Sequence, residues 1–229
     1  QRQMCIRDSL LLAACQPTPQ TCKPSDYIKL KDEIAIQQKQ LQSRYDSATT
    51  ASGKKAISKE AQDYIFKKIT GDIFNCWMGT EWDFNGTTTV PGQGKIACGY
   101  FVNTVLLHAG FDLPRVKWSQ IASETLIKNL TEKENIKRFS NAPISKIEAV
   151  IKEWGSGLYV IGLDSHVGFI VNDGDKITFV HADYYNPETG VKSESLDDHS
   201  PLSDSSYRVI GKVLTAKMMR AWLSNSSLN

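Results

Sequence analysis

Apolar positions in the first part of the chain recur at helical spacing. Residues 26–47 lack Gly and Pro and carry one apolar stripe, which predicts a helix that is either a spacer or packed on the domain. A polar linker is expected at 48–55 and a second helix at 58–69. Glycines and prolines interrupt every period between 71 and 94, which predicts a long loop rich in aromatic side chains. The stripe of the first helix consists of Tyr27, Leu30, Ile34, Leu41 and Tyr45.

The period changes in the second half of the chain. A helix is expected to begin near Cys98 and to end at Gly110, with further helices at 119–130 and 145–154. Short β-branched runs then predict strands at 158–163, 165–171, 176–182 and 207–214, followed by a helix at 218–223 and a disordered tail. Strands that follow helices predict an α+β fold, with N-terminal helices packed on a small antiparallel sheet.

Composition narrows the class of protein. The chain has 229 residues, with 27 Lys and Arg against 25 Asp and Glu, for a net charge of +2. These charges are interspersed and form no basic stripe, so the sequence does not indicate nucleic-acid binding. No apolar stretch reaches the roughly 20 residues that a membrane-spanning helix needs.

The start of the chain carries a different signal. Residues 1–9 have no hydrophobic period, and we interpret them as an artefact foreign to the native chain. Leu12-Ala13-Ala14-Cys15 resembles a bacterial lipobox, and a Pro/Thr/Gln-rich tether follows it. We therefore expect a truncated lipoprotein signal and tether at 10–24, with lipid on Cys15 as the only membrane anchor. A helical spacer at 25–56 and one catalytic domain at 57–229 complete the predicted organisation.

Cys98 is the candidate nucleophile. It lies at the predicted start of a helix, where free backbone N–H groups and the helix dipole favour a thiolate, so its pKa is expected to be lowered. The alternative is a small buried side chain without chemistry. Cys22 and Cys76 are able to pair in an oxidising compartment, although two cysteines do not define a disulfide framework.

Two histidines supply the partners that a catalytic cysteine needs. His166 and His181 lie on consecutive predicted strands, and a turn centred at Asp173-Gly174 would place them directly opposite each other. We expect His166 to act as the base and His181 to orient it. Either histidine alone would be an ordinary half-buried strand residue. We expect no catalytic role for the remaining two, His108 within a predicted helix and His199 in a polar loop.

These motifs, in this order, resemble the NlpC-type cell-wall peptidases, which are papain-like enzymes with a Cys-His-His triad. Ala97-Cys98-Gly99-Tyr100 stands where the family usually has Asp-Cys-Ser-Gly, and Trp82-Asp83-Phe84-Asn85-Gly86 stands where it has an aromatic-Gly-Gly segment. Ser165-His166-Val167-Gly168 and Phe179-Val180-His181-Ala182 resemble its two histidine strands. The resemblance implies a papain-like fold and a substrate cleft formed by Trp82, Asp83 and Tyr100.

The expected function is therefore hydrolysis of amide bonds in peptidoglycan stem peptides by a monomeric, lipid-anchored cysteine hydrolase of the cell envelope. No cofactor is implied, and no metal, because no His/Asp/Glu cluster has ligand spacing. The altered residues around Cys98 leave three alternatives open. These are a CHAP-type amidase, another papain-like amidase or acyltransferase, and a catalytically inactive wall-associated lipoprotein of the same fold.

Overall fold

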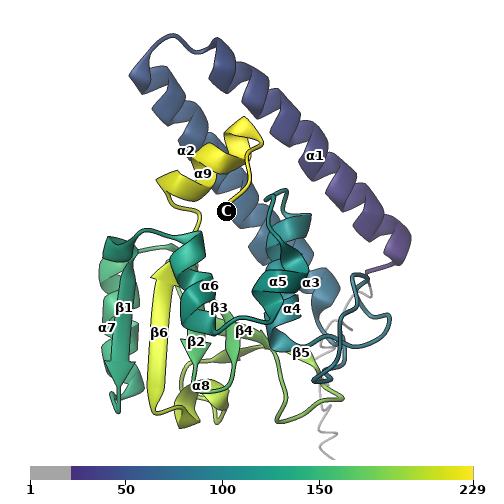
Figure 1. The fold of residues 1–229 in the computed structure, drawn as a ribbon, viewed down its shortest axis with the longest axis vertical. Helices are drawn as coiled ribbons and strands as arrows, with labels where there is room; N and C mark the ends of the chain where they lie inside the picture. Colours follow the sequence, from purple (N-terminus) through teal and green to yellow (C-terminus); the bar gives the residue numbers. More distant parts are fainter. Residues whose placement is uncertain (1–21, 229) are drawn as a thin grey trace, which may run out of the picture.

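The N-terminal part of the protein is a helical hairpin. A computed structural model describes residues 22–228, which begin with α1 (Pro24–Ser47) and α2 (Ala51–Lys67), the two long arms at the top of Figure 1. Pro24 occupies the first turn of α1, where its fixed φ angle suits a helix and its missing N–H is not needed. The predicted linker at 48–55 is wrong in length, because Thr50 accepts a hydrogen bond from the Gly53 N–H and caps α2 early.

Helical structure also continues where a loop was predicted. α2 runs into η1 (Lys68–Ile73), a π-helical turn, and then into α3 (Phe74–Trp77). Ile69, Ile73 and Trp77 recur every four residues and are all fully buried. This burial keeps the segment helical through Gly71 despite the low helix propensity of glycine, so the irregular loop begins only after Trp77.

The other helices connect to and cover a sheet. They are α4 (Cys98–His108), α5 (Arg115–Ser119), α6 (Ser123–Leu130), η2 (Lys133–Asn135), α7 (Ile144–Trp154), α8 (Pro201–Asp204) and α9 (Ala216–Ser224). The single helix predicted at 119–130 is wrong, because the chain forms α5 and α6 with a break at 120–122.

Residues 22–228 form one antiparallel six-stranded sheet in the order β1-β6-β2-β3-β4-β5, so the expected α+β class with an antiparallel sheet is confirmed. Two strands were not predicted, β1 and β5, and both lie at the edges of the sheet. Both strands are partly exposed to solvent and contain charged residues among the apolar ones. Neither sequence therefore forms an apolar run. The strands are β1 (Ile136–Ser140), β2 (Gly157–Leu163), β3 (Val167–Asn172), β4 (Ile177–Ala182), β5 (Val191–Ser195) and β6 (Tyr207–Lys212).

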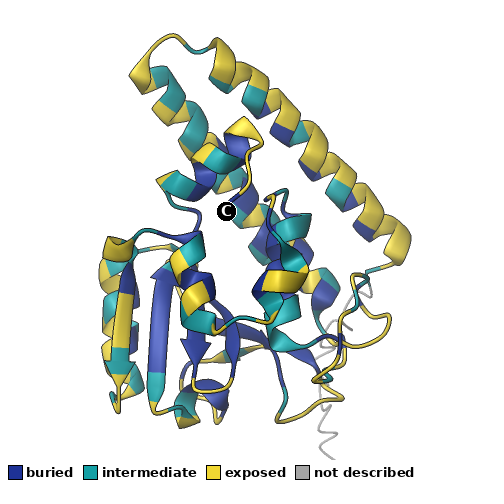
Figure 2. Cartoon of the chain, viewed as in Figure 1, coloured by how far each residue is buried: buried dark blue, intermediate teal, exposed yellow. Residues whose placement is uncertain are grey.

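Each face of the sheet has its own core. Leu158 and Val160 of β2 belong to the larger core, which includes α1 to α6 and α9. Tyr159 and Ile161 of the same strand point to the opposite face and pack with α7 and α8. The central strands are therefore buried on both sides, as the dark blue ribbon in Figure 2 shows.

The first helix belongs to the larger core and is not a separate spacer. Tyr27, Leu30, Ile34 and Leu41 of α1 are buried in that core, and a disulfide joins Cys22 to Cys76 at the start of the helix. The expected boundary at residue 56 lies inside α2. Of the two interpretations of residues 26–47, the contacts therefore agree with a helix packed on the domain.

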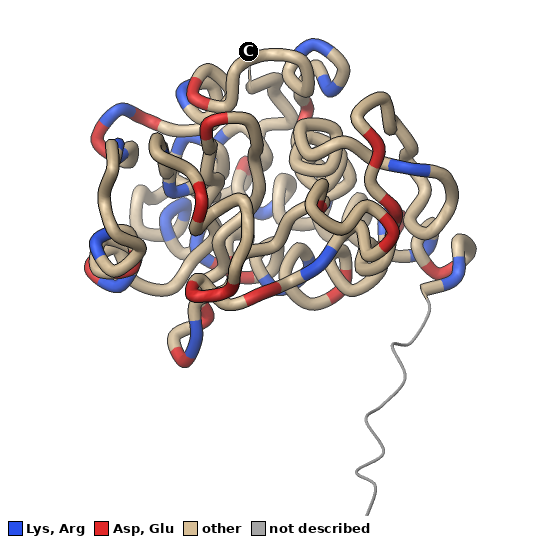
Figure 3. Tube along the Cα trace, turned by 90° about the horizontal axis from the view of Figure 1, so that it is seen from below, with Lys and Arg blue, Asp and Glu red and all other residues tan. Residues whose placement is uncertain are grey.

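The C-terminal segment is ordered, where disorder was expected. Leu228 is buried, and its N–H donates to the carbonyl oxygen of Asp112 over 3.0 Å. The expectations for residues 1–9 and 10–21, including Cys15, lie outside the described residues. Within residues 22–228, no helix combines the length and the apolar character needed to cross a bilayer. Acidic and basic residues are interspersed over the molecule (Figure 3).

Candidate active site

Cys98 begins the helix α4, as the sequence predicted, and it is the only free cysteine among residues 22–228. The preceding loop fixes its position through two backbone hydrogen bonds, from the Ile96 N–H to Glu81 and from the Ala97 N–H to Gly86. Ala97 is extended, so the chain enters the helix abruptly and the thiol is presented at the first turn. The side chain is half-buried.

The environment of the Cys98 thiol differs from the expected one. Burial raises the pKa of the thiol, although hydrogen bonds from the backbone N–H groups of Val167, Gly99 and Cys98 act to lower it. The expected lowering of the pKa is therefore wrong, because removal from water disfavours the thiolate more than these N–H groups stabilise it. Cys98 is a neutral thiol at neutral pH in the free protein.

His166 follows a tight turn between β2 and β3. The turn is closed by the Leu163 N–H, which donates to the His166 carbonyl oxygen over 2.8 Å. The side chain is 4% exposed, and its Nε2 lies 2.9 Å from Nδ1 of His181, which is fully buried on β4. The contact between the two histidines that the sequence predicted is present.

The register behind this contact is not the predicted one. Four residues, 173–176, connect β3 to β4, because the Asp173 carboxylate accepts hydrogen bonds from the N–H groups of Asp175 and Lys176. Phe169 pairs with Val180, which shifts the strands by two residues from the expected pairing and places Gly168 beside His181. His166 therefore reaches His181 diagonally, across the position of Gly168, and not from the directly opposed position.

The ionisation of His166 follows from its surroundings. Burial lowers the pKa of His166 well below its usual value, and repulsion from His181 lowers it further, against a smaller opposing effect of Asp183. The imidazole is therefore neutral at physiological pH. Its second nitrogen, Nδ1, is buried and has no hydrogen-bond partner among the described residues.

Cys98 and His166 line the same cavity, which has a volume of about 460 Å³. The thiol lies at the backbone N–H of Val167, the residue that follows His166. Ser119, Ser123 and Tyr207 add hydroxyl groups to the lining, and Trp118 and Leu163 add apolar surface. The candidate nucleophile, the candidate base and a partly apolar space thus lie in one place.

The other predicted substrate residues do not line this cavity. Tyr184 separates Trp82 from His166. The centroid of the Tyr184 ring lies 5.9 Å from that of Trp82 and 5.1 Å from that of His166. The Asp83 carboxylate accepts the Asn85 N–H within its own turn. The Tyr100 ring stacks under the Arg115 guanidinium at 4.9 Å. Asp83 and Tyr100 thus make local contacts around the site, and the cleft role expected for them stays a prediction.

Sequence reasoning missed two neighbours of the histidines. Tyr184 packs on the His166 ring, and the Glu194 carboxylate lies 2.9 Å from Nε2 of His181. Tyr184 comes two residues after the end of β4, and Glu194 lies on the edge strand β5 that was not predicted. The alternation of Lys192 and Glu194 with serines was the available signal for that strand.

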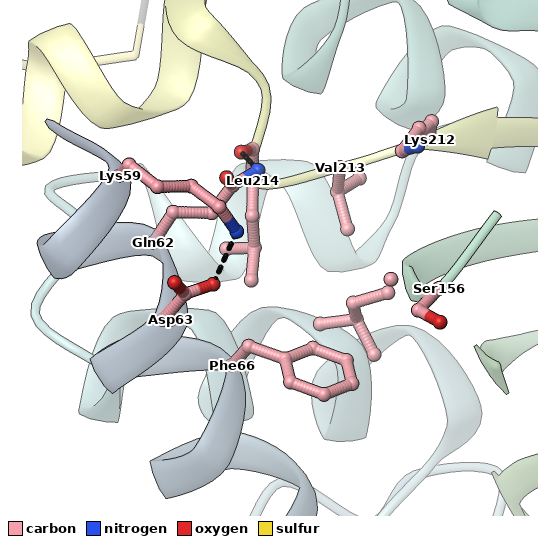
Figure 4. Close-up of a pocket in the computed structure, with 10 residues that line it drawn as sticks. Lys59, Gln62, Asp63, Phe66, Ser156, Lys212, Val213 and Leu214 are labelled. Atoms are coloured by element: carbon pink, nitrogen blue, oxygen red, sulfur yellow. Dashed lines mark hydrogen bonds and ion pairs between the residues drawn. The ribbon is translucent and has the colours of Figure 1, made fainter. Parts of the chain in front are cut away.

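A second pocket lies between α2 and the ends of β2 and β6 (Figure 4). Lys59, Gln62 and Lys212 are among its lining residues, but neither Cys98 nor a histidine is. Lys59 pairs with Asp63, Gln62 donates to the Leu214 carbonyl oxygen over 2.8 Å, and Lys212 donates to the Trp154 carbonyl oxygen. These polar groups are engaged with the protein itself, so the Cys98 cavity is the stronger candidate site.

Comparison with known proteins gives no neighbour: no family model, no curated protein and no solved structure matches this chain. Within residues 22–228, no group of three or more His, Cys, Asp or Glu side chains is placed to hold a metal ion. Only the chemistry of the site therefore indicates a function.

Proposed function

We propose that the protein is a papain-like cysteine hydrolase of the NlpC type that cleaves amide bonds in peptidoglycan stem peptides. The observation that carries the proposal is the hydrogen bond between His166 and His181 beside the cavity that Cys98 and His166 share. A helix-start cysteine, a neutral histidine with a free nitrogen and a second histidine that orients the first are the parts needed for acyl transfer. The order of the sequence motifs supports the choice of family.

The mechanism follows from a neutral thiol and a neutral imidazole. As Sγ of Cys98 attacks the carbonyl carbon of the scissile amide, the thiol proton passes to Nδ1 of His166. The backbone N–H of Cys98, in the first turn of α4, donates to the oxyanion. The imidazolium then protonates the leaving amine, and the thioester remains on Cys98.

Water completes the cycle. His166 takes a proton from the water that attacks the thioester, and the thiolate leaving group recovers that proton as the acid product departs. His181 holds the His166 ring in one orientation through both steps. Burial of both groups keeps the separated charges short-lived, because the thiolate and the imidazolium are each disfavoured in the free protein.

The location of the enzyme is part of the proposal. Lipid on Cys15 would anchor the monomer in the cell envelope, within reach of peptidoglycan. Cys15→Ser is expected to move the protein from the membrane fraction to the soluble fraction without changing the activity of the purified domain. Continued membrane association of this variant would contradict the anchor.

Digestion of purified peptidoglycan, followed by mass analysis of the fragments, tests the activity directly. Cys98→Ala should release no peptide fragments, and the loss in His166→Ala should lie near the upper end of the roughly 100- to 10,000-fold range of general base catalysis. His181→Asn should retain part of the activity, since the amide keeps a polar partner for His166. His199→Ala is the matched control, because this histidine is exposed and does not line the Cys98 cavity.

A catalytically inactive wall-associated protein is the competing function, and the same digestion separates it from the proposal. Retained wall binding by the wild type with no release of fragments would favour it. Fragments that contain the intact stem peptide freed from the glycan would favour a CHAP-type amidase.

A further inference from the structure

The hydrogen-bond chain that starts at His166 does not end at His181. Nε2 of His181 lies 2.9 Å from Oε1 of Glu194, on the neighbouring strand β5. His181 is fully buried, and the Glu194 side chain is 8% exposed, so solvent has little access to this contact. A carboxylate therefore meets the buried histidine pair from the side away from His166.

A lysine holds this carboxylate in its charged form. Nζ of Lys192 lies 2.6 Å from Oε2 of Glu194 and 3.0 Å from Oδ2 of Asp183. Burial acts to raise the pKa of Glu194, but the hydrogen bonds from His181 and Lys192 outweigh it and the pKa is lowered. Glu194 is thus ionised and offers only acceptor atoms.

The ionised carboxylate fixes where the protons lie. Because Glu194 only accepts, the hydrogen between it and His181 must be on Nε2 of His181. In the tautomer that carries hydrogen on Nε2 alone, His181 accepts from His166 at Nδ1, and His166 then carries its own hydrogen on Nε2. Nδ1 of His166 is left with a lone pair, and it is this buried atom that has no partner among residues 22–228.

We propose that Glu194 is a positioning residue that sets the tautomers of both histidines, so that His166 presents a proton-accepting Nδ1 to the Cys98 cavity. The inference rests on the proposed function for its catalytic consequence. Without Glu194, His181 is free to carry its hydrogen on Nδ1. His166 would then accept that hydrogen on Nε2 and carry its own hydrogen on Nδ1. Nδ1 could then not accept the thiol proton of Cys98.

The test combines a measurement of tautomers with a measurement of rate. Nitrogen-15 NMR of histidine-labelled protein reports which ring nitrogen carries hydrogen, and it needs no substrate. In the wild type we expect Nε2–H on both histidines; in Glu194→Gln we expect a mixture or the reversed pair. Release of peptide from peptidoglycan should fall about 10- to 100-fold in Glu194→Gln, as for other carboxylates that orient ligating histidines.

Two variants complete the design. Glu194→Asp keeps the acceptor and should recover most of the wild-type tautomer pattern and part of the rate, while Glu153→Gln, on the exposed surface of α7, should behave as the wild type. Hydrogen on Nδ1 of His166 in the wild type would overturn the inference, even if Glu194→Gln failed to fold. Wild-type tautomers and rate in a folded Glu194→Gln would overturn it as well.

The outcomes separate this inference from the function. The expected tautomers together with no release of fragments by the wild type would contradict the proposed hydrolase and support the positioning role. If the wild type releases fragments but Glu194→Gln keeps the wild-type tautomers, the result would support the hydrolase and contradict the positioning role.

Discussion

Gly168 lies so close to His181 that a Cβ atom built on the glycine would be 2.9 Å from the Cβ of the histidine and 2.6 Å from Cε2 of Phe179. The two residues are on adjacent strands and face the same side of the sheet. Because Gly168 has no side chain, the ring of His166 reaches across it to His181. The diagonal histidine contact thus depends on a glycine between the two rings.

Gly168→Ala is accordingly expected to damage the site more than the fold. The added methyl group would push His181 and Phe179 aside and lengthen the 2.9 Å bond between the histidines. We expect peptide release to fall at least about 10-fold, with a loss of about 1–3 kcal/mol in the free energy of unfolding. Gly71→Ala is the control, because a Cβ there meets nothing within 4 Å. Full activity in Gly168→Ala would show that the contact is dispensable.

Labelling of Cys98 by iodoacetamide should reveal a thiol that is protonated at neutral pH. Its raised pKa predicts slow labelling between pH 6 and 7 and an increase only above about pH 8.5, the value of an ordinary thiol. Since both groups are neutral in the free protein, His166→Ala should change this profile little. A labelling rate that is already maximal near pH 6 would indicate a preformed thiolate and imidazolium pair, contrary to the mechanism given above.

How far the sequence predicts this protein depends on whether the determining contacts are local. The start of the helix at Cys98 is predictable because Gly94 precedes it and apolar residues follow at helical spacing. The histidine contact was expected, but its register depends on the Asp173 side chain, which lengthens the turn by capping it. Local propensity does not show whether the turn has two or four residues.

Other features depend on packing between distant segments. Edge strand β5 has no apolar run, so Glu194 and its contact with His181 were not predictable without the sheet. The pKa of Cys98 was misjudged because the helix start is visible in the sequence and the burial is not. Tyr100 points to Arg115 for a similar reason, since α5 packs against α4 in a way that no spacing indicates.

His108 should make the fold sensitive to mild acid. Burial lowers the pKa of His108 to about 4, and its Nδ1 lies 2.9 Å from the hydroxyl group of Tyr27 on α1. The folded state therefore binds fewer protons than the unfolded state, in which an ordinary histidine has a pKa of about 6.5. The stability that this neutral histidine contributes is complete above about pH 6.5 and is lost as the pH falls toward 4.

The measurement is denaturant unfolding at several pH values between 7.5 and 4. In His108→Asn the decline in unfolding free energy should be shallower than in the wild type, by up to about 1.4 kcal/mol per pH unit for one proton. His199→Asn should leave the wild-type slope in place, because that side chain is 81% exposed. Equal slopes in His108→Asn and the wild type would mean that His108 does not titrate on unfolding.

Gly99 packs closely against the backbone of α5. A Cβ on Gly99 would lie 2.4 Å from the carbonyl oxygen of Ser119, at the end of α5, and backbone atoms cannot move aside as side chains do. The Ser119 hydroxyl also donates to the Gly99 carbonyl oxygen over 3.2 Å, and both residues line the Cys98 cavity. α5 therefore occupies the space that a serine side chain at position 99 would need.

Replacement of Gly99 by serine should thus be harmful. Gly99→Ser is expected to lower the free energy of unfolding by about 1–3 kcal/mol and to reduce peptide release, because α5 must shift away from the thiol. Gly99→Ala separates the steric effect from that of the hydroxyl group and should lose nearly as much stability. Gly71→Ala, in a helical segment with open space around it, should be neutral or stabilising by up to about 1 kcal/mol. A Gly99→Ser variant as stable and active as the wild type would contradict the close approach of Ser119 to Gly99.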